Sequence, residues 1–481
     1  MVVLERRDIQ GVVVSGYGHL PRSAYLLFRI EDQAAARAWL GAMAEEVTDA
    51  AGKRAECSVN VALTYDGLAA LGLDDDALRT FPLPFTDRMD SPRRATILGD
   101  SGESAPAGWD WGNAANRVHV LLMVFGPDEA ELETVVTRFT DGIAAAGAMS
   151  LVANLPGHRL PGGKEHFGFR DGIGQPIIEG NERRAEKQLA RTGHVTVVKA
   201  GEFVLGYPNE YGLPPVSPVV AAARDPLGLL PEYDVPDDLR FSSHTGPLRD
   251  LGRNGSYLVF RQLRQDVAGF WAFLDDATRG ATGGPDRAAQ ERLGAKFVGR
   301  WPSGAPLVLA PDQDDPSLAT ANDFSYAALD SHGFACPLGS HVRRANPRDA
   351  LRDDAAESVR SVRRHRIVRL GRFYGDVPAD PRHADDTDRG IYFLCLNADI
   401  ERQFEFVQQT WLNDTVFRGL DSETDPLVGD QDDSLCARTM TIQADPLRRK
   451  VTNLQRFVTT RGGSYFFLPG LNALRYLGAL A

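Results

Sequence analysis

The sequence has few cysteines, and none of them lies in a pattern that would make a metal site or a redox pair. Its four cysteines, Cys57, Cys336, Cys395 and Cys436, are far apart, and no CxxC pair exists. Structural zinc sites use closely spaced cysteine and histidine ligands, so such a site is not expected. None of the ten histidines forms an HxH or HxxxH pair, so no multi-histidine metal site is visible locally.

Several catalytic signatures are also missing. The sequence contains no GxSxG, no GxxxxGK[ST], no HExxH and no strand-linked GxGxxG, which removes the local signals for hydrolase elbows, phosphate loops, zinc proteases and dinucleotide-binding loops. There is no excess of positive charge either. The net charge of -12 argues against binding to nucleic acid and to anionic membranes.

Long apolar runs are absent. No run approaches the roughly 20 residues needed to span a bilayer. Near the N-terminus, Arg6 and Arg7 lack the apolar segment and cleavage site of an export signal. We therefore expect a cytoplasmic protein without a membrane segment, and its 481 residues are enough for two domains.

The first half of the chain alternates strand-like and helix-like patterns. The expected strands cover 25–30, 57–64, 118–125 and 149–153, and the expected helices cover 33–46 and a segment after Pro127. The resulting order is strand, helix, strand, strand, helix, strand. That order predicts a split βαβ, or ferredoxin-like, arrangement. Between the second and third strands, 74–116 reads as a long polar stretch.

The second half shows similar strand-then-helix units. The expected strands cover 256–263, 391–396 and 464–468, with helices over 266–278, after Asp399 and over 470–479. Seven prolines predict an irregular excursion over 208–236, and 421–433 reads as a solvated acidic loop. We predict an α+β protein with two related domains, over 1–160 and 161–481.

One acidic residue stands out by its neighbours. Asp171 lies between Gly168 and Gly172 in the stretch HFGFRDGIGQP, and Gly174 follows. Glycine allows close backbone approach and positive φ, so this acid is set in a tight turn. An ordinary turn with an Asx cap is the simpler explanation when the segment is taken alone.

Two further segments carry groups able to do polar chemistry. His341 lies in CPLGSHVRRANPR, and Arg369 lies in RIVRLGRFYG. Taken singly, a histidine of this kind is usually structural, and an arginine usually faces solvent or pairs with a carboxylate. Together, one histidine, one acid and one arginine suit a haem peroxidase. Its iron needs a proximal ligand, and the opposite face needs a base and a cation.

These three segments resemble the dye-decolorizing peroxidase family. The family's GxxDG motif matches Gly168 to Gly172, its proximal-histidine segment matches the stretch with His341, and its distal arginine matches Arg369. The segments RFVTTRGGSYFFLPG and DIQGVVVSGYGHL also look like family segments. The resemblance covers nearly the whole chain, and the length is similar to that of the larger, more elaborated members.

The resemblance implies two ferredoxin-like domains with antiparallel sheets and peripheral helices, and one haem b (heme b) per chain in the C-terminal domain. His341 would be the proximal ligand of the haem iron. Asp171 and Arg369 would lie on the distal side, where Asp171 moves the peroxide proton and Arg369 stabilises developing charge. Hydrogen peroxide would be reduced through a ferryl intermediate, and dyes, phenolics or other one-electron donors would be oxidised.

Two expectations follow from chemistry alone. An aspartate base stays ionised at lower pH than a histidine, so dye oxidation should have an acidic optimum. Bulky dyes cannot reach a buried haem, so a surface tyrosine or tryptophan is expected to be oxidised in its place. By residue type and rough location, the candidates are Trp271, Tyr326, Tyr374 and Trp411.

Two other functions remain open at this point. The chain could be a haem-binding protein for haem handling or iron release, which needs His341 but neither Asp171 nor Arg369. It could also be a structural α+β protein in which the Gly-Asp turn and the histidine are incidental. The sequence leaves the physiological reductant open, and a monomer and a homodimer are both compatible with it.

Overall fold

The computed structural model describes residues 2–52, 56–234, 246–279, 284–432 and 436–480. Within these ranges, none of the helices has both the length and the apolar character needed to cross a membrane.

The first half folds as its hydrophobic pattern predicts. Its main elements are β1 (Arg22–Ile30), α2 (Gln33–Glu46), β2 (Ser58–Leu63), β3 (Val120–Gly126), α7 (Glu129–Ala145) and β4 (Met149–His158). The four strands lie in the order β4-β1-β3-β2, and all their pairings are antiparallel. This is the strand order of a ferredoxin-like unit.

The second half repeats this order. Its main elements are β9 (Ser256–Gln265), α9 (Val267–Thr278), β10 (Val368–Arg369), β11 (Arg372–Tyr374), β12 (Gly390–Asn397), η8 (Glu401–Glu405), η9 (Val407–Leu412) and β15 (Val458–Leu468). Strand β9 lies between β15 and β12, and β10 and β11 pair with the far edge of β12. The predicted α+β class with two ferredoxin-like units is confirmed.

The two units share one closed sheet. Strand β15 pairs with β2, and β11 pairs with β4. The additional pairing of β12 with β9 completes a ring of strands. Strands from both sides of residue 160 therefore belong to the same sheet, and the division into domains 1–160 and 161–481 stays a prediction.

Both faces of most strands of this sheet are buried, whereas β4 is largely half-exposed or exposed. Along β1, Tyr25 and Leu27 belong to one apolar cluster, whereas Leu26 and Phe28 belong to another. Successive side chains of a strand point to opposite faces. The strands therefore read as continuous apolar runs in the sequence, without polar alternation.

Helices and short strands surround the closed sheet. The remaining helices are α1 (Gly11–Val14), α3 (Tyr65–Ala70), α4 (Asp75–Leu78), α5 (Leu83–Asp87), α6 (Pro92–Leu98), α8 (Glu182–Thr192), α10 (Arg287–Val298), α11 (Tyr326–Leu329), α12 (His341–Ala345), α13 (Ala355–Arg363) and α14 (Leu471–Gly478). The short strands are β5 (Ile177–Ile178), β6 (Val197–Val198), β7 (Val219–Ala221), β8 (Leu248–Asp250), β13 (Met440–Ile442) and β14 (Arg449–Val451).

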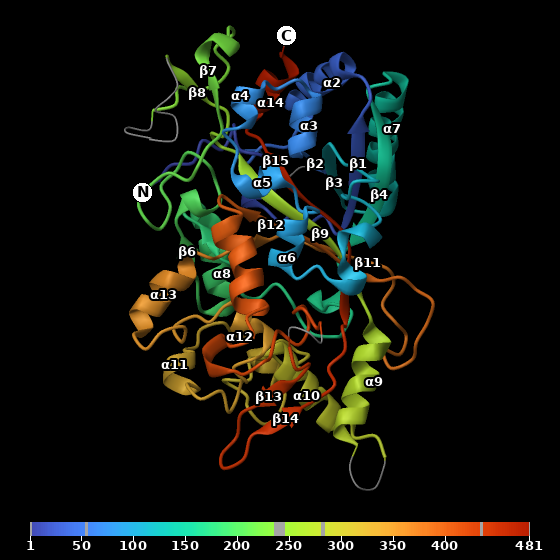
Figure 1. Ribbon diagram of the computed structural model, residues 1–481, viewed down its shortest axis with the longest axis vertical. Coiled ribbons are helices and arrows are strands. Elements are labelled where there is room, and N and C mark those ends of the chain that lie inside the picture. Colours follow the sequence, from blue (N-terminus) through green and yellow to red (C-terminus); the bar gives the residue numbers. More distant parts are fainter. Residues whose placement is uncertain (1, 53–55, 235–245, 280–283, 433–435, 481) are drawn as a thin grey trace.

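The molecule has two visibly different parts. Figure 1 shows the large sheet and the helices of the first half in the upper part, and α9 to α12 with the β13–β14 hairpin in the lower part. The lower part has its own apolar cluster, which includes Phe169, Phe270 and Tyr326. It is built from short elements joined by long loops, and the candidate site lies between these loops and the sheet.

Three predictions about local structure need correction. The stretch 74–116 contains the short helices α4, α5 and α6, and the excursion 208–236 contains β7, although residues 235–236 lie outside the described residues. The prediction of a solvated acidic loop over 421–433 is wrong for 421–432, while residue 433 lies outside the described residues. Asp425 is 0% exposed, because the surrounding structure supplies partners for its carboxylate.

Candidate active site

The structure brings the three segments singled out by their sequence to one place. Nη1 of Arg369, on β10, donates to Oδ1 of Asp171 at 2.9 Å. The charge of His341 also acts on Asp171, and the charges of Asp171 and Arg369 act on His341. His341 follows Asp171 by 170 positions in the chain, and Arg369 follows it by 198. The three side chains nevertheless form one electrostatically coupled group.

The loop that carries Asp171 needs its glycines. Gly168 and Gly172 have φ of +98° and +78°, which side chains of L residues rarely adopt. The backbone N–H of Asp171 donates to the carbonyl of Gly163 at 3.0 Å. A Cβ built on either glycine would meet nothing within 4 Å. The glycines are therefore required by backbone conformation and not by crowding.

A half-buried glutamate, Glu165, holds the same loop in place through hydrogen bonds. The carboxylate of Glu165 accepts hydrogen bonds from the backbone N–H groups of Phe167 (2.8 Å) and Phe169 (2.9 Å) and from the Gln265 side chain (2.8 Å). Burial raises the pKa of Glu165 to about 7 despite these three donors. The sequence does not single out Glu165, because nothing in its neighbours distinguishes it from an exposed glutamate.

The loop is also fastened to the strand that carries Arg369. The side chain of Gln175 donates to the carbonyl of Arg369 and accepts from its backbone N–H, both at 3.1 Å. Arg366 donates to the carbonyl of Gly174 at 2.6 Å. Asp171 and Arg369 are therefore held in register by backbone contacts as well as by their own ion pair.

Asp171 remains ionised and accessible. Burial raises its pKa, but the Arg369 guanidinium, the Gly172 N–H and His341 outweigh burial, so its pKa lies below the ordinary value of 3.8. The side chain of Asp171 is 44% exposed and that of Arg369 is 31% exposed. The pair thus faces open space within reach of small molecules.

His341 begins α12 and is oriented by a second acid. Its Nδ1 lies 3.0 Å from Oδ2 of Asp425, and since the Asp425 carboxylate can only accept, Nδ1 is the donor. Asp425 raises the pKa of His341 against the effect of burial, and His341 lowers the pKa of Asp425 against the same effect. Within the described residues, Nε2 of His341 has no hydrogen-bond partner and is left as a free ligand atom.

The anchor of His341 is itself rigid. The other oxygen of Asp425 accepts from the backbone N–H groups of Leu427 and Val428, both at 2.9 Å. The sequence could not identify Asp425, because it is one of several acids in 421–433 and lies 84 residues from His341. Its role depends wholly on a tertiary contact.

Three arginines lie beside this site without acidic partners among the described residues; one of them is buried and the other two are half-buried. Arg300, Arg348 and Arg366 form no ion pair with any residue that the structure describes, and Nε of Arg348 is buried without a hydrogen-bond partner. Burial and their mutual repulsion lower the pKa of Arg300 to about 10 and that of Arg366 to about 9. Arg369 adds to the positive charge at both positions.

These features fit a haem. A neutral imidazole whose Nδ1 is bonded to a carboxylate presents Nε2 to a metal in a fixed orientation. The three arginines without acidic partners supply positive charge that suits the two negatively charged propionate groups of a haem. No group of three or more histidine, cysteine, aspartate or glutamate side chains suited to a metal ion occurs among the described residues. Nε2 of His341, which has no hydrogen-bond partner among the described residues, fits the part of an iron ligand.

The candidates for surface oxidation are not on the surface. Trp271, Tyr326, Tyr374 and Trp411 are 6%, 1%, 6% and 3% exposed, respectively. Their apolar neighbours cover them; Trp271, for example, stacks parallel to Phe169 with ring centroids 6.5 Å apart. These four candidates, named from residue type and rough location alone, are therefore packing residues of the core, and none of them is placed to meet a dye directly.

Known proteins resemble this chain over almost its whole length, although no family model matches it. A dye-decolorizing peroxidase of Mycena epipterygia is 30% identical over 456 residues, covering 88% of this chain and 76% of that protein. The structure of a fungal peroxidase of this type from Auricularia auricula-judae superposes with a TM-score of 0.77 at 25% identity, covering 100% of both chains. A dye-decolorizing peroxidase solved in complex with 2,6-dimethoxyphenol gives the same TM-score of 0.77 at 25% identity, covering 99% of this chain and 100% of that one.

Proposed function

The chain belongs to the dye-decolorizing peroxidase family, and we propose that it reduces hydrogen peroxide at a haem bound through His341 and oxidises dyes and phenolics as one-electron donors. It is a haem-dependent oxidoreductase that acts on peroxide. The observation that carries the residue assignment is the ion pair of Asp171 and Arg369, which is exposed to small molecules and coupled to His341.

His341 and Asp425 form the holding side of the site. Nε2 of His341 would coordinate the iron, while Asp425 accepts the Nδ1 hydrogen bond and keeps the imidazole in one orientation. Arg300, Arg348 and Arg366 supply the positive charge for the propionates. When bound, the haem supplies the iron that takes electrons from donors and delivers them to peroxide.

Asp171 and Arg369 form the reacting side. The Asp171 carboxylate would accept a proton from one oxygen of hydrogen peroxide and deliver it to the other oxygen, which leaves as water. The Arg369 guanidinium stabilises the negative charge that develops on the leaving oxygen. Because their ion pair keeps Asp171 ionised, the base is ready before peroxide arrives.

The donors are proposed from the chemistry of the relatives. One relative was solved with 2,6-dimethoxyphenol, which supports small phenolics as donors here. The cytoplasmic location and the choice between monomer and homodimer stay predictions.

The test is a stopped-flow reaction of the haem-loaded protein with hydrogen peroxide, followed at the Soret band. Asp171→Asn and Arg369→Leu are compared with the parent protein. We expect a fast reaction in the parent and a loss of about 10²- to 10⁴-fold in at least one variant.

A normal ferric spectrum with a slow reaction that neither variant changes would contradict the assignment. It would instead favour the alternative of a haem-binding protein for haem handling or iron release, which needs His341 alone. A protein that shows no Soret band after haem is supplied would exclude both functions.

A further inference from the structure

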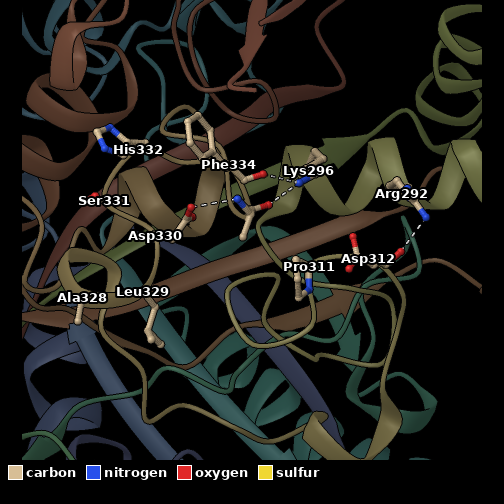
Figure 2. Close-up of a pocket in the computed structure, with 11 residues that line it drawn as sticks. Arg292, Lys296, Pro311, Asp312, Ala328, Leu329, Asp330, Ser331, His332 and Phe334 are labelled. Atoms are coloured by element: carbon tan, nitrogen blue, oxygen red, sulfur yellow. Dashed lines mark hydrogen bonds between the residues drawn. The ribbon is translucent and has the colours of Figure 1, made fainter. Parts of the chain in front are cut away.

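A surface pocket lies behind the helix that carries His341. It encloses about 440 Å³ and is lined by residues of α10, α11 and the loop that leads to α12. Figure 2 shows Arg292 and Lys296 on α10, with Phe334 beside Lys296, Asp312 beside Arg292, and His332 and Leu329 farther from the helix. The volume is that of a site for a drug-sized molecule.

The positive charge of this pocket is not neutralised by an ion pair. Arg292 and Lys296 lie one turn apart on α10. Arg292 donates to the carbonyl of Asp312 at 2.7 Å, and Lys296 donates to the carbonyls of Phe334 and Ala335 at 3.1 and 2.5 Å. Among the described residues neither cation has a carboxylate within ion-pair distance, and both retain N–H groups for a ligand.

The rest of the pocket lining includes apolar and aromatic side chains. Phe334 is 49% exposed and Leu329 is 58% exposed. The His332 ring stacks on the Phe334 ring, with centroids 5.5 Å apart and an interplanar angle of 27°. Large apolar side chains inside a hollow, next to unpaired cations, suit a flat molecule with an anionic group at one end.

The floor of the pocket is bonded directly to the helix of His341. The Asp330 carboxylate accepts from Arg343 of α12 at 2.9 Å and from the N–H of Cys336 at 2.8 Å. Ser340, which precedes His341, donates its hydroxyl to the carbonyl of Lys296 at 2.5 Å. A short path of covalent and hydrogen bonds therefore connects the pocket to the ligand of the iron.

We propose that this pocket binds an aromatic donor that carries a sulfonate or carboxylate, with the anion on Arg292 and Lys296 and the ring against Phe334. The proposal rests on the proposed peroxidase function and names a donor class for it. Two such donors, each losing one electron and one proton, balance the reduction of one hydrogen peroxide to two waters.

Asp312 limits the affinity of this site. Its carboxylate lies at the same opening as the two cations and repels an anionic group. Replacing Asp312 with asparagine keeps the backbone carbonyl that Arg292 uses and removes the negative charge. The variant should therefore bind an anionic donor more tightly than the parent does.

The test measures binding before it measures turnover. A monosulfonated anthraquinone dye is titrated into the ferric holoenzyme without peroxide, by calorimetry. We expect Kd to rise about tenfold in Arg292→Gln combined with Lys296→Gln, and to fall about threefold in Asp312→Asn. The unsulfonated anthraquinone should show no such dependence on charge.

A kinetic arm separates this proposal from the proposed function. With peroxide, the double variant should show a raised KM for the dye at unchanged kcat, while its turnover of neutral 2,6-dimethoxyphenol equals that of the parent. If the parent oxidises 2,6-dimethoxyphenol but the Kd or the KM for the dye is the same in the double variant, the pocket is not the donor site. If the parent oxidises neither donor, the peroxidase function itself fails.

Discussion

The site contains two pairs of a carboxylate and a nitrogen-bearing side chain, Asp425 with His341 and Asp171 with Arg369, and the two pairs have opposite environments. Asp425 is 0% exposed and is fixed by two backbone N–H groups besides His341. Asp171 is 44% exposed, and the charges around it lower its pKa. A carboxylate bonded to a nitrogen-bearing side chain therefore serves as a rigid anchor where it is buried, as at Asp425. It can react with small molecules where it is exposed, as at Asp171.

The difference in exposure between the two aspartates arises from the backbone segments to which they belong. Asp171 lies in a loop with two glycines of positive φ and open space around them. Asp425 lies in a compact turn that satisfies its own carboxylate. Each pair can be broken separately, so the comparison can be tested one side at a time.

The largest effect is expected when His341, the residue proposed to bind the haem iron, is removed. His341→Ala removes the ligand atom, so the affinity for haem should fall by more than about 100-fold. The measurement is the Soret band that remains after gel filtration of the haem-loaded protein. His332→Ala is a matched control, because His332 is an exposed histidine that lines the surface pocket. Equal retention by both variants would show that another residue holds the haem.

A smaller effect on the peroxide reaction is expected when Asp425 loses its negative charge but keeps a hydrogen-bond acceptor. Asp425→Asn keeps an acceptor for Nδ1 of His341 but removes the negative charge, so the reduction potential of the iron should rise. The reaction with peroxide should slow by about 10- to 100-fold. Spectroelectrochemistry measures the potential, with Asp421→Asn as a control in the same segment. An unchanged potential in Asp425→Asn would mean that the anchor only orients the imidazole.

The pH dependence of the peroxide reaction reports on the open pair. The pKa of Asp171 is below 3.8, so the base stays ionised and the rate should hold from neutral pH down to about pH 4. Arg369→Leu removes the nearest positive charge, so in this variant the decline should begin about one pH unit higher. Stopped-flow rates measured from pH 3 to 8 test this expectation. A parent rate that already declines above pH 5, or a dye oxidation optimum above neutrality, would contradict Asp171 as the base.

The smallest effect concerns Glu165, which holds the loop of Asp171, and the free energy of unfolding. The folded-state pKa of Glu165 is raised to about 7 from 4.5. Its contribution to stability is therefore present below pH 4.5 and lost as the pH rises through 7. Between these limits the parent should lose on the order of 2 kcal/mol of unfolding free energy from this group, after allowance for partial solvent contact.

Glu165→Gln cannot ionise, so this part of the pH dependence should disappear. Urea unfolding of both proteins at pH 4.5 and at pH 7.5 gives the difference. Glu179→Gln is a control on a glutamate that pairs with Lys199 at 3.0 Å. Identical slopes in the parent and in Glu165→Gln would show that Glu165 is already ionised in the folded protein.

The sequence was most informative where the physics is local. The apolar runs of β1, β3, β9 and β12 identify themselves, since a strand with two buried faces has no polar alternation. Asp171 was recognisable because the glycines on both sides of it indicate a backbone conformation that other residues rarely adopt. His341 and Arg369 became meaningful only when the three segments were taken together as a resemblance to one family.

The rest depended on contacts that no local pattern contains. Asp425 and Glu165 are acids in acidic or ordinary surroundings, and only their enclosed hydrogen-bond partners set them apart. The acidic segment after residue 421 was mistaken for a solvated loop because charge density predicts exposure when the partners are unknown. The surface pocket behind α12 combines segments from three elements that the sequence does not place together.

In the closed ring of strands, the sheet edges of the first half of the chain pair with the sheet edges of the second half. The two halves are therefore complementary. Residues Leu63 and His158 of the first half pair with Phe467 and Phe373 of the second. If the halves were expressed apart, β2 and β4 would become unpaired sheet edges on one fragment, and β11 and β15 on the other. Exposed edges of this kind favour aggregation. Mixed together, the two fragments carry the matching edges needed to reassemble, which makes the junction between the halves a natural position for a split reporter.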